Sequence, residues 1–74
     1  LTIRVQVPNR PGMLATVISA ISSAGGSMGQ IDLIEQTRQV SVRDITVDCT
    51  STSHAESIVD TVKALPESKI VNVY

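Results

Sequence analysis

Apolar and polar residues alternate at the start of the chain. Ile3, Val5 and Val7 occupy every second position and are separated by polar residues. This period of two, with β-branched side chains, predicts a half-buried β-strand over Leu1–Val7. Pro8 ends the predicted strand, because proline has no N–H to donate to a sheet ladder.

From Pro11 the apolar spacing changes to that of an α-helix. Pro11 is expected in the first helical turn, where a missing N–H costs nothing. The helix ends at Gly25–Gly26, because glycine readily takes the left-handed conformation that caps helices. The apolar positions recur at i, i+3, i+4 and i+7, which is one helical face; they are Leu14, Val17, Ile18 and Ile21.

Two further strands follow, with a short connection between them. The first is predicted over Ser27–Glu35 and carries apolar residues on both faces. Residues 36–39 lack glycine and asparagine, so a loose loop is expected there. The next strand, Val40–Cys49, changes its apolar parity midway, which predicts a β-bulge near Arg43–Asp44.

The last third of the chain predicts a helix and a short strand. Ser53 and Glu56 have the spacing of a capping box at a helix start. Pro66 ends this helix, and Lys69–Tyr74 forms the last strand. The inward-facing residues of the helix are Ile58, Val59, Val62 and Leu65.

The predicted order is strand, helix, strand, strand, helix, strand. Two strand–helix–strand units joined by a hairpin predict an α+β, ferredoxin-like βαββαβ fold. This fold has one four-stranded antiparallel sheet with two helices on one face. The length of 74 residues predicts one domain, residues 1–74.

Composition narrows the range of partners. The net charge of −1 argues against a nucleic-acid or anionic-membrane surface. No apolar run approaches the ~20 residues of a membrane span, and no signal peptide is recognisable. Cys49 is the only cysteine, so no internal disulfide can form, and a cytoplasmic location is expected. The start at Leu1, without Met, suggests a fragment of a longer chain.

Several functions that proteins of this fold perform require residues that this chain lacks. An RNA-recognition module needs stacking aromatics, and Tyr74 is the only aromatic residue. A metallochaperone needs paired cysteines in the first strand–helix loop, and Asn9–Gly12 has none. No acid–base pair accompanies that loop, so a small hydrolase is the least favoured alternative. No catalytic residue, metal site or cofactor is predicted. His54 is interpreted as a solvated surface residue and Cys49 as a small core residue.

The connection between the first strand and the first helix is the best candidate for a small-molecule site. Free N–H groups at a helix start attract a carboxylate or phosphate. Gly12 leaves that end without a side chain, and Asn9 and Arg10 stand beside it with hydrogen-bond donors. The alternative is that Asn9 and Arg10 are only turn and capping residues.

The second strand is predicted to pair with its copy in a homodimer. It lies at the sheet edge in the ferredoxin-like order. Residues 26–35 contain no proline or lysine, which usually protect an edge. A small chain gains from covering such a strand with its twin, and two-fold interfaces are the commonest solution.

The chain also resembles a known family. The stretch Val5–Leu14, with its Asn-Arg-Pro-Gly turn, and the Gly-Gly before the second strand resemble the ACT domain, an amino-acid-sensing regulatory module. Residues 30–33, 42–47 and 70–73 are similar to the amino-terminal ACT domain of some bacterial NAD-dependent malic enzymes, which are oxidoreductases that decarboxylate malate.

This resemblance implies a non-catalytic regulatory module attached to a malic-enzyme-like oxidoreductase. Ligand-binding members hold an amino acid between the first loop of one subunit and the second strand of its partner. The best-known serine sensors have a histidine two residues before the asparagine and a second asparagine opening the second strand; Val7 and Ser27 stand at those places. A purely structural dimerisation domain that binds no metabolite is the alternative. The candidate ligand-binding residues are Asn9, Arg10, Pro11, Gly12, Met13, Leu14, Ser27, Gly29 and Gln30.

Overall fold

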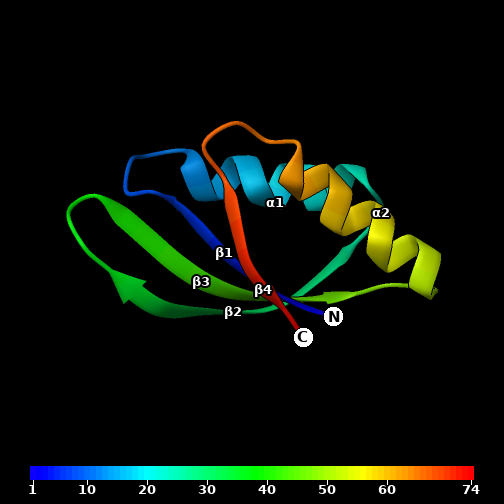
Figure 1. Cartoon of the computed structure of the whole chain (residues 1–74). Helices are drawn as coiled ribbons and strands as arrows, with labels where there is room; N and C mark the ends of the chain where they lie inside the picture. Colours follow the sequence, from blue (N-terminus) through cyan, green and yellow to red (C-terminus); the bar gives the residue numbers. More distant parts are fainter.

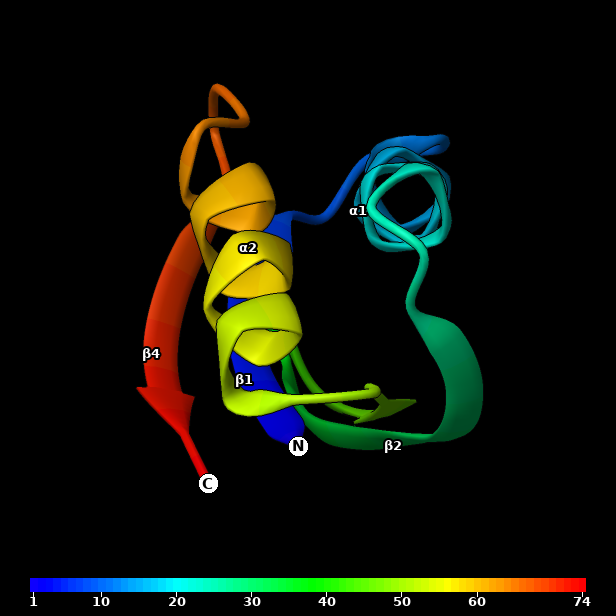
Figure 2. The ribbon, with the colours of Figure 1, turned by 90° about the vertical axis from the view of Figure 1, so that its right-hand side faces the viewer.

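The computed structural model describes all 74 residues as one sheet covered by two helices. The strands lie in the order β2-β3-β1-β4 and every neighbouring pair is antiparallel. Both helices lie on the same face of the sheet (Figures 1 and 2). This arrangement confirms the predicted ferredoxin-like fold. Its elements are β1 (Thr2–Pro8), α1 (Met13–Ser23), β2 (Ser27–Gln36), β3 (Val40–Asp48), α2 (Thr52–Lys63) and β4 (Lys69–Val73).

The core lies between the helices and the two central strands, β1 and β3. The predicted alternation in β1 is confirmed, since Ile3, Val5 and Val7 expose at most 3% of their surface. Each helix buries two residues of its predicted apolar face and leaves the others half-buried at the margin. The nine residues of the core cluster are Ile3, Val5, Val7, Val17, Ile21, Ile45, Val47, Ile58 and Val62.

The start of α1 differs from the prediction. The helix begins at Met13, and Pro11 precedes the capping residue, Gly12, instead of lying in the first turn. Gly12 has φ 87°, a left-handed conformation that interrupts the helical backbone and that glycine adopts without steric cost. The predicted end is confirmed, because Gly25 follows the helix at φ 82°.

The start of α2 also differs from the predicted capping box. Ser51, not Ser53, is the N-cap, and its Oγ accepts a hydrogen bond from the His54 N–H at 3.1 Å. Ser51 is extended, with φ −165° and ψ 170°, as an N-cap residue must be. Several hydroxyl residues stand in a row before this helix, so spacing alone does not identify the cap.

The predicted bulge in β3 is wrong, because the extra residues lie in β2. Leu33 pairs with Arg43 and Glu35 with Val42, which leaves Ile34 without an opposite residue. A second irregularity in β2 lies between Met28 and Ile31. The β1–β3 register, by contrast, is regular throughout. Since pairing keeps Arg43 opposite Val5, Arg43 faces the helices.

The hairpin between β2 and β3 is tighter than the predicted loose loop. The Thr37 hydroxyl accepts hydrogen bonds from the N–H groups of Gln39 and Val40, at 3.2 and 3.1 Å. The Thr37 N–H donates to the Val40 carbonyl at 2.8 Å. A threonine side chain therefore organises a turn that lacks glycine.

The two ends of the chain lie side by side (Figure 1). Thr2 and Tyr74 exchange two backbone hydrogen bonds, at 3.1 and 2.8 Å. Neither helix is long and apolar enough to cross a lipid bilayer.

Candidate functional site

Three connections meet at one end of the molecule: β1–α1, the β2–β3 hairpin and α2–β4. Asn9 donates its backbone N–H to Gln39 O at 2.9 Å and its side-chain Nδ2 to Thr37 O at 2.7 Å. Asn9 therefore fastens the β1–α1 connection to the hairpin. This bond uses one of the two Nδ2 hydrogens, so the other hydrogen and the acceptor Oδ1 remain for a ligand.

Arg10 is held by the α2–β4 connection. One guanidinium nitrogen donates to both carboxylate oxygens of Glu67, each at 2.8 Å, and lies 3.5 Å from Met13 Sδ. Both side chains of this ion pair are about half exposed. The charge of Arg10 is thus already paired with a carboxylate of the same chain.

The amino end of α1 is open. Pro11 and Gly12 are exposed, and no atom lies within 4 Å of the position that a Cβ on Gly12 would occupy. The first helical turn contains no acidic residue to occupy its free N–H groups. Met13 and Leu14 are half-buried against the core. This end can therefore accept an anionic group from outside.

The other predicted site residues lie elsewhere in the chain. Ser27, Gly29 and Gln30 are exposed at the start of β2, which follows the carboxyl end of α1. Eleven helical residues span roughly 16 Å, so one chain does not bring these residues to the amino end of α1. Gly29 is also a packing glycine, because an added Cβ would lie 3.2 Å from Thr46 O.

Sequence reasoning missed two polar residues beneath the helices. Ser41 and Arg43 of β3 pair with Val7 and Val5, whose side chains enter the core. Ser41 is 4% exposed. Its Oγ and the Arg43 Nε are buried and have no hydrogen-bond partner in the protein. The sequence did contain a signal for this facing, because Ser41 and Arg43 lie at every second position before the buried Ile45. The bulge wrongly predicted at Arg43–Asp44 placed them on the opposite face.

The sheet face away from the helices carries a close ion pair. Arg4 Nε and Nη2 donate to the two Asp44 carboxylate oxygens at 2.7 and 2.9 Å. These hydrogen bonds, helped by charge attraction and opposed by partial desolvation, lower the pKa of Asp44 and raise the pKa of Arg4. The guanidinium also lies 5.4 Å from the centre of the Tyr74 ring. The group joins β1, β3 and the residue that follows β4.

His54 is not the solvated surface residue that was predicted. Its Nδ1 accepts from the Thr50 N–H at 3.0 Å, so its Nε2 donates to Ala24 O, 2.9 Å away. His54 therefore ties the start of α2 to the end of α1. Cys49 lies just after β3 and packs against the core, as predicted.

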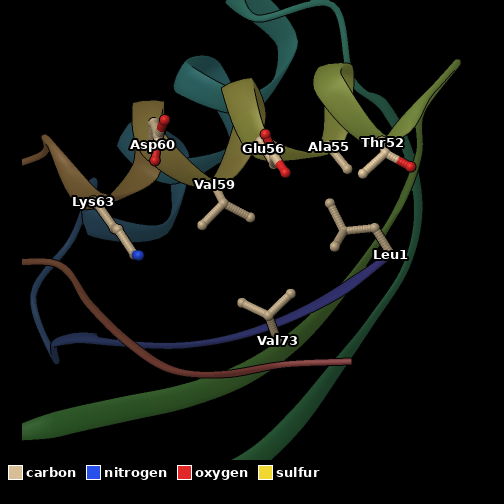
Figure 3. A pocket seen from close by; sticks show the side chains of 8 residues that line it. All are labelled: Leu1, Thr52, Ala55, Glu56, Val59, Asp60, Lys63 and Val73. Carbon is tan, nitrogen blue, oxygen red and sulfur yellow. The ribbon is translucent and has the colours of Figure 1, made fainter.

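A pocket of about 320 Å³ lies between α2 and the chain ends (Figure 3). Leu1, Val59 and Val73 form its apolar part, and Glu56, Asp60 and Lys63 project from α2 around it. None of the predicted ligand-binding residues lines this pocket. No group of three His, Cys, Asp or Glu side chains is placed to hold a metal ion.

Comparison with known proteins identifies the family of the chain. Residues 1–67 match the model of the ACT domain family. The chain is 36% identical over 73 residues, or 99% of its length, to an NAD-dependent malic enzyme of Geobacillus stearothermophilus. It is 29% identical over 66 residues, or 89% of its length, to NAD-dependent malic enzyme 1 of Bacillus subtilis strain 168. The matched region is 15% of the length of each relative. The chain belongs to the ACT domain family.

Proposed function

We propose that this chain is a regulatory module that dimerises through β2, binds a small amino acid and controls an attached NAD-dependent malic enzyme. The attachment is supported by the two relatives, which are named as such enzymes and are much longer than this chain. The ACT domain family consists of regulatory modules. The catalytic residues of the whole protein would lie in the attached enzyme and not in this module.

The exposed apolar edge of β2 is the observation that carries this proposal. Ile31, Leu33 and Ile34 expose 36, 54 and 45% of their surface on a ten-residue edge strand. The outer edge of a strand of this length offers backbone donors and acceptors to another chain. The opposite edge, β4, has five residues against the ten of β2, so it is the poorer template.

A two-fold β2–β2 pairing would complete the candidate ligand site. Antiparallel pairing places the start of each β2 beside the end of its partner's β2. The end of β2 leads into Thr37, which Asn9 holds next to α1. Ser27, Gly29 and Gln30 of the partner subunit would thereby approach the amino end of α1. The carboxylate of an amino acid would bind the α1 N–H groups, and its ammonium group would donate to Asn9 Oδ1.

Dimerisation is tested by sedimentation velocity at tens of micromolar protein. The unmodified chain is expected to be a dimer, and Leu33→Lys is expected to be a monomer because it places a charge in the apolar interface. The matched control is Val71→Lys, which alters a residue of similar exposure, 49%, on the opposite edge. A monomeric unmodified chain at high micromolar concentration would overturn the proposal.

Ligand binding is tested by calorimetry with the twenty amino acids. Asn9→Ala is expected to weaken binding by roughly tenfold or more, since a hydrogen bond to a charged group contributes about 1.5–3 kcal/mol. Asn72→Ala, an equivalent truncation on β4 far from α1, is the control and should bind normally. A dimer that binds no amino acid would support the alternative, a purely structural dimerisation domain.

A further inference from the structure

The helix-facing side of the two central strands carries one charged residue, Arg43. Its neighbours in the pairing are Val5 on β1 and Leu33 on β2. Val5 is 1% exposed, whereas Leu33 is 54% exposed, so Arg43 lies at the boundary between the covered core and the uncovered edge strand. This is the side of the sheet on which α1 lies (Figure 2).

Ser41 extends the same polar feature toward the β1–α1 connection. It pairs with Val7, two residues before Asn9, and with Gln36, the last residue of β2. Ser41 exposes only 4% of its surface, yet its Oγ has no hydrogen-bond partner. A buried hydroxyl and a buried guanidinium N–H without acceptors destabilise a fold. The two atoms lie on one strand, two residues apart, and the protein offers neither of them a hydrogen-bond partner.

We infer that Arg43, with Ser41, binds a second carboxylate of the ligand, so that the domain is selective for acidic amino acids. This inference rests on the proposed function. The α1 N–H groups receive the α-carboxylate, and the arginine on the floor beneath α1 receives the side-chain carboxylate. Guanidinium groups suit this task because they donate two parallel hydrogen bonds to a planar carboxylate. Arg10, by contrast, is occupied by Glu67.

Calorimetry with two matched pairs of probes tests the inference on the full chain. L-aspartate is compared with L-asparagine, and L-glutamate with L-glutamine, because each pair differs by one charge at nearly constant shape. The acidic member of at least one pair is expected to bind roughly tenfold tighter or more than its amide. Arg43→Gln is expected to abolish this preference, and Ser41→Ala to reduce it. Arg38→Gln removes the same charge from the exposed hairpin and should leave the preference unchanged.

Thermal unfolding of the free protein separates a binding role from a structural one. Because the buried Arg43 Nε has no partner in the protein, Arg43→Met is expected to keep or raise the Tm without ligand. A lower Tm would show that Arg43 serves the fold, and it would count against the inference.

The outcomes distinguish the inference from the proposed function. The inference is overturned if acids and amides bind equally, or if the Arg43→Gln variant binds aspartate and glutamate as tightly as the unmodified chain does. Either result leaves the proposed amino-acid binding intact. Absence of binding by every amino acid overturns both. An acidic preference that depends on Arg43 and not on Arg38 supports both.

Discussion

At the residue scale, the entry into α1 depends on the backbone of Gly12. Its φ of 87° lies in the left-handed region, where an L-residue is strained by about 1–2 kcal/mol. Gly12→Ala is therefore expected to lower the free energy of unfolding by about that amount, measured by urea denaturation. The open space around Gly12 means that strain, not collision, causes the loss.

A second substitution at the same position checks this reason. Asn tolerates the left-handed conformation better than Ala does. Gly12→Asn is therefore expected to cost less than Gly12→Ala despite its larger side chain. Equal or greater destabilisation by Asn would indicate that the side chain meets an obstacle, which contradicts the strain argument.

Asp44 makes the stability of the domain depend on pH. Its pKa is lowered in the folded state because Arg4 hydrogen-bonds its carboxylate. The folded protein therefore holds this proton less tightly than the unfolded chain. The stabilisation is complete above the pKa of an unfolded aspartate, about 3.9, and is lost as the pH falls through the lower folded value.

Thermal unfolding between pH 7 and pH 2 measures this contribution. Asp44→Asn is expected to lower the Tm at pH 7 and to reduce the fall of Tm in acid. Asp48→Asn, an exposed carboxylate at the end of the same strand, is the control. An acid limb that is as steep in Asp44→Asn as in the unmodified chain would contradict the assignment.

At the element scale, the pattern predicted β1 and α1 because their apolar periods are unbroken. β2 was predicted to exist but not to have its observed faces. Two bulges bring Met28, Ile31 and Leu33 to the helix-facing side, although Met28 has the opposite parity in sequence. An extra residue in one strand is set by pairing with its neighbour, which is not encoded in local periodicity. The same error hid the facing of Ser41 and Arg43.

The candidate site was located by residue type, and its internal bonds were not predictable. The open amino end of α1 follows from the Pro-Gly turn in the sequence. The engagement of Asn9 with Thr37 and of Arg10 with Glu67 depends on contacts over 28 and 57 residues. No motif specifies such distant partners, so the sequence could not tell which of these two polar groups remained available.

His54 links the two helices and provides a prediction at this scale. It bonds the Ala24 carbonyl, where α1 ends, and the Thr50 N–H, before α2 begins. His54→Ala is expected to destabilise the fold by about 1–3 kcal/mol, because it removes two hydrogen bonds. Equilibrium urea denaturation measures this loss. His54→Gln, which can replace one bond, should lose less; no loss in His54→Ala would refute the role.

At the scale of the whole molecule, the core is small. Ten hydrophobic residues are buried, and the edge strand keeps Leu33 and Ile34 in solvent. A dimer that covers β2 gains stability by mass action. The Tm is therefore expected to rise with protein concentration, and this dependence should vanish in Leu33→Lys. A Tm of the unmodified chain that stays constant over roughly a hundredfold range of protein concentration would contradict this expectation.

The paired ends of the chain have a consequence for the connectivity of the fold. Thr2 and Tyr74 are already joined by two backbone hydrogen bonds, so a short glycine linker can close the polypeptide into a ring. The ring can be reopened at Arg38, an exposed residue in the hairpin. Such a circular permutant keeps every strand pairing of the sheet. The order in which the six elements are synthesised is thus separable from the architecture they form.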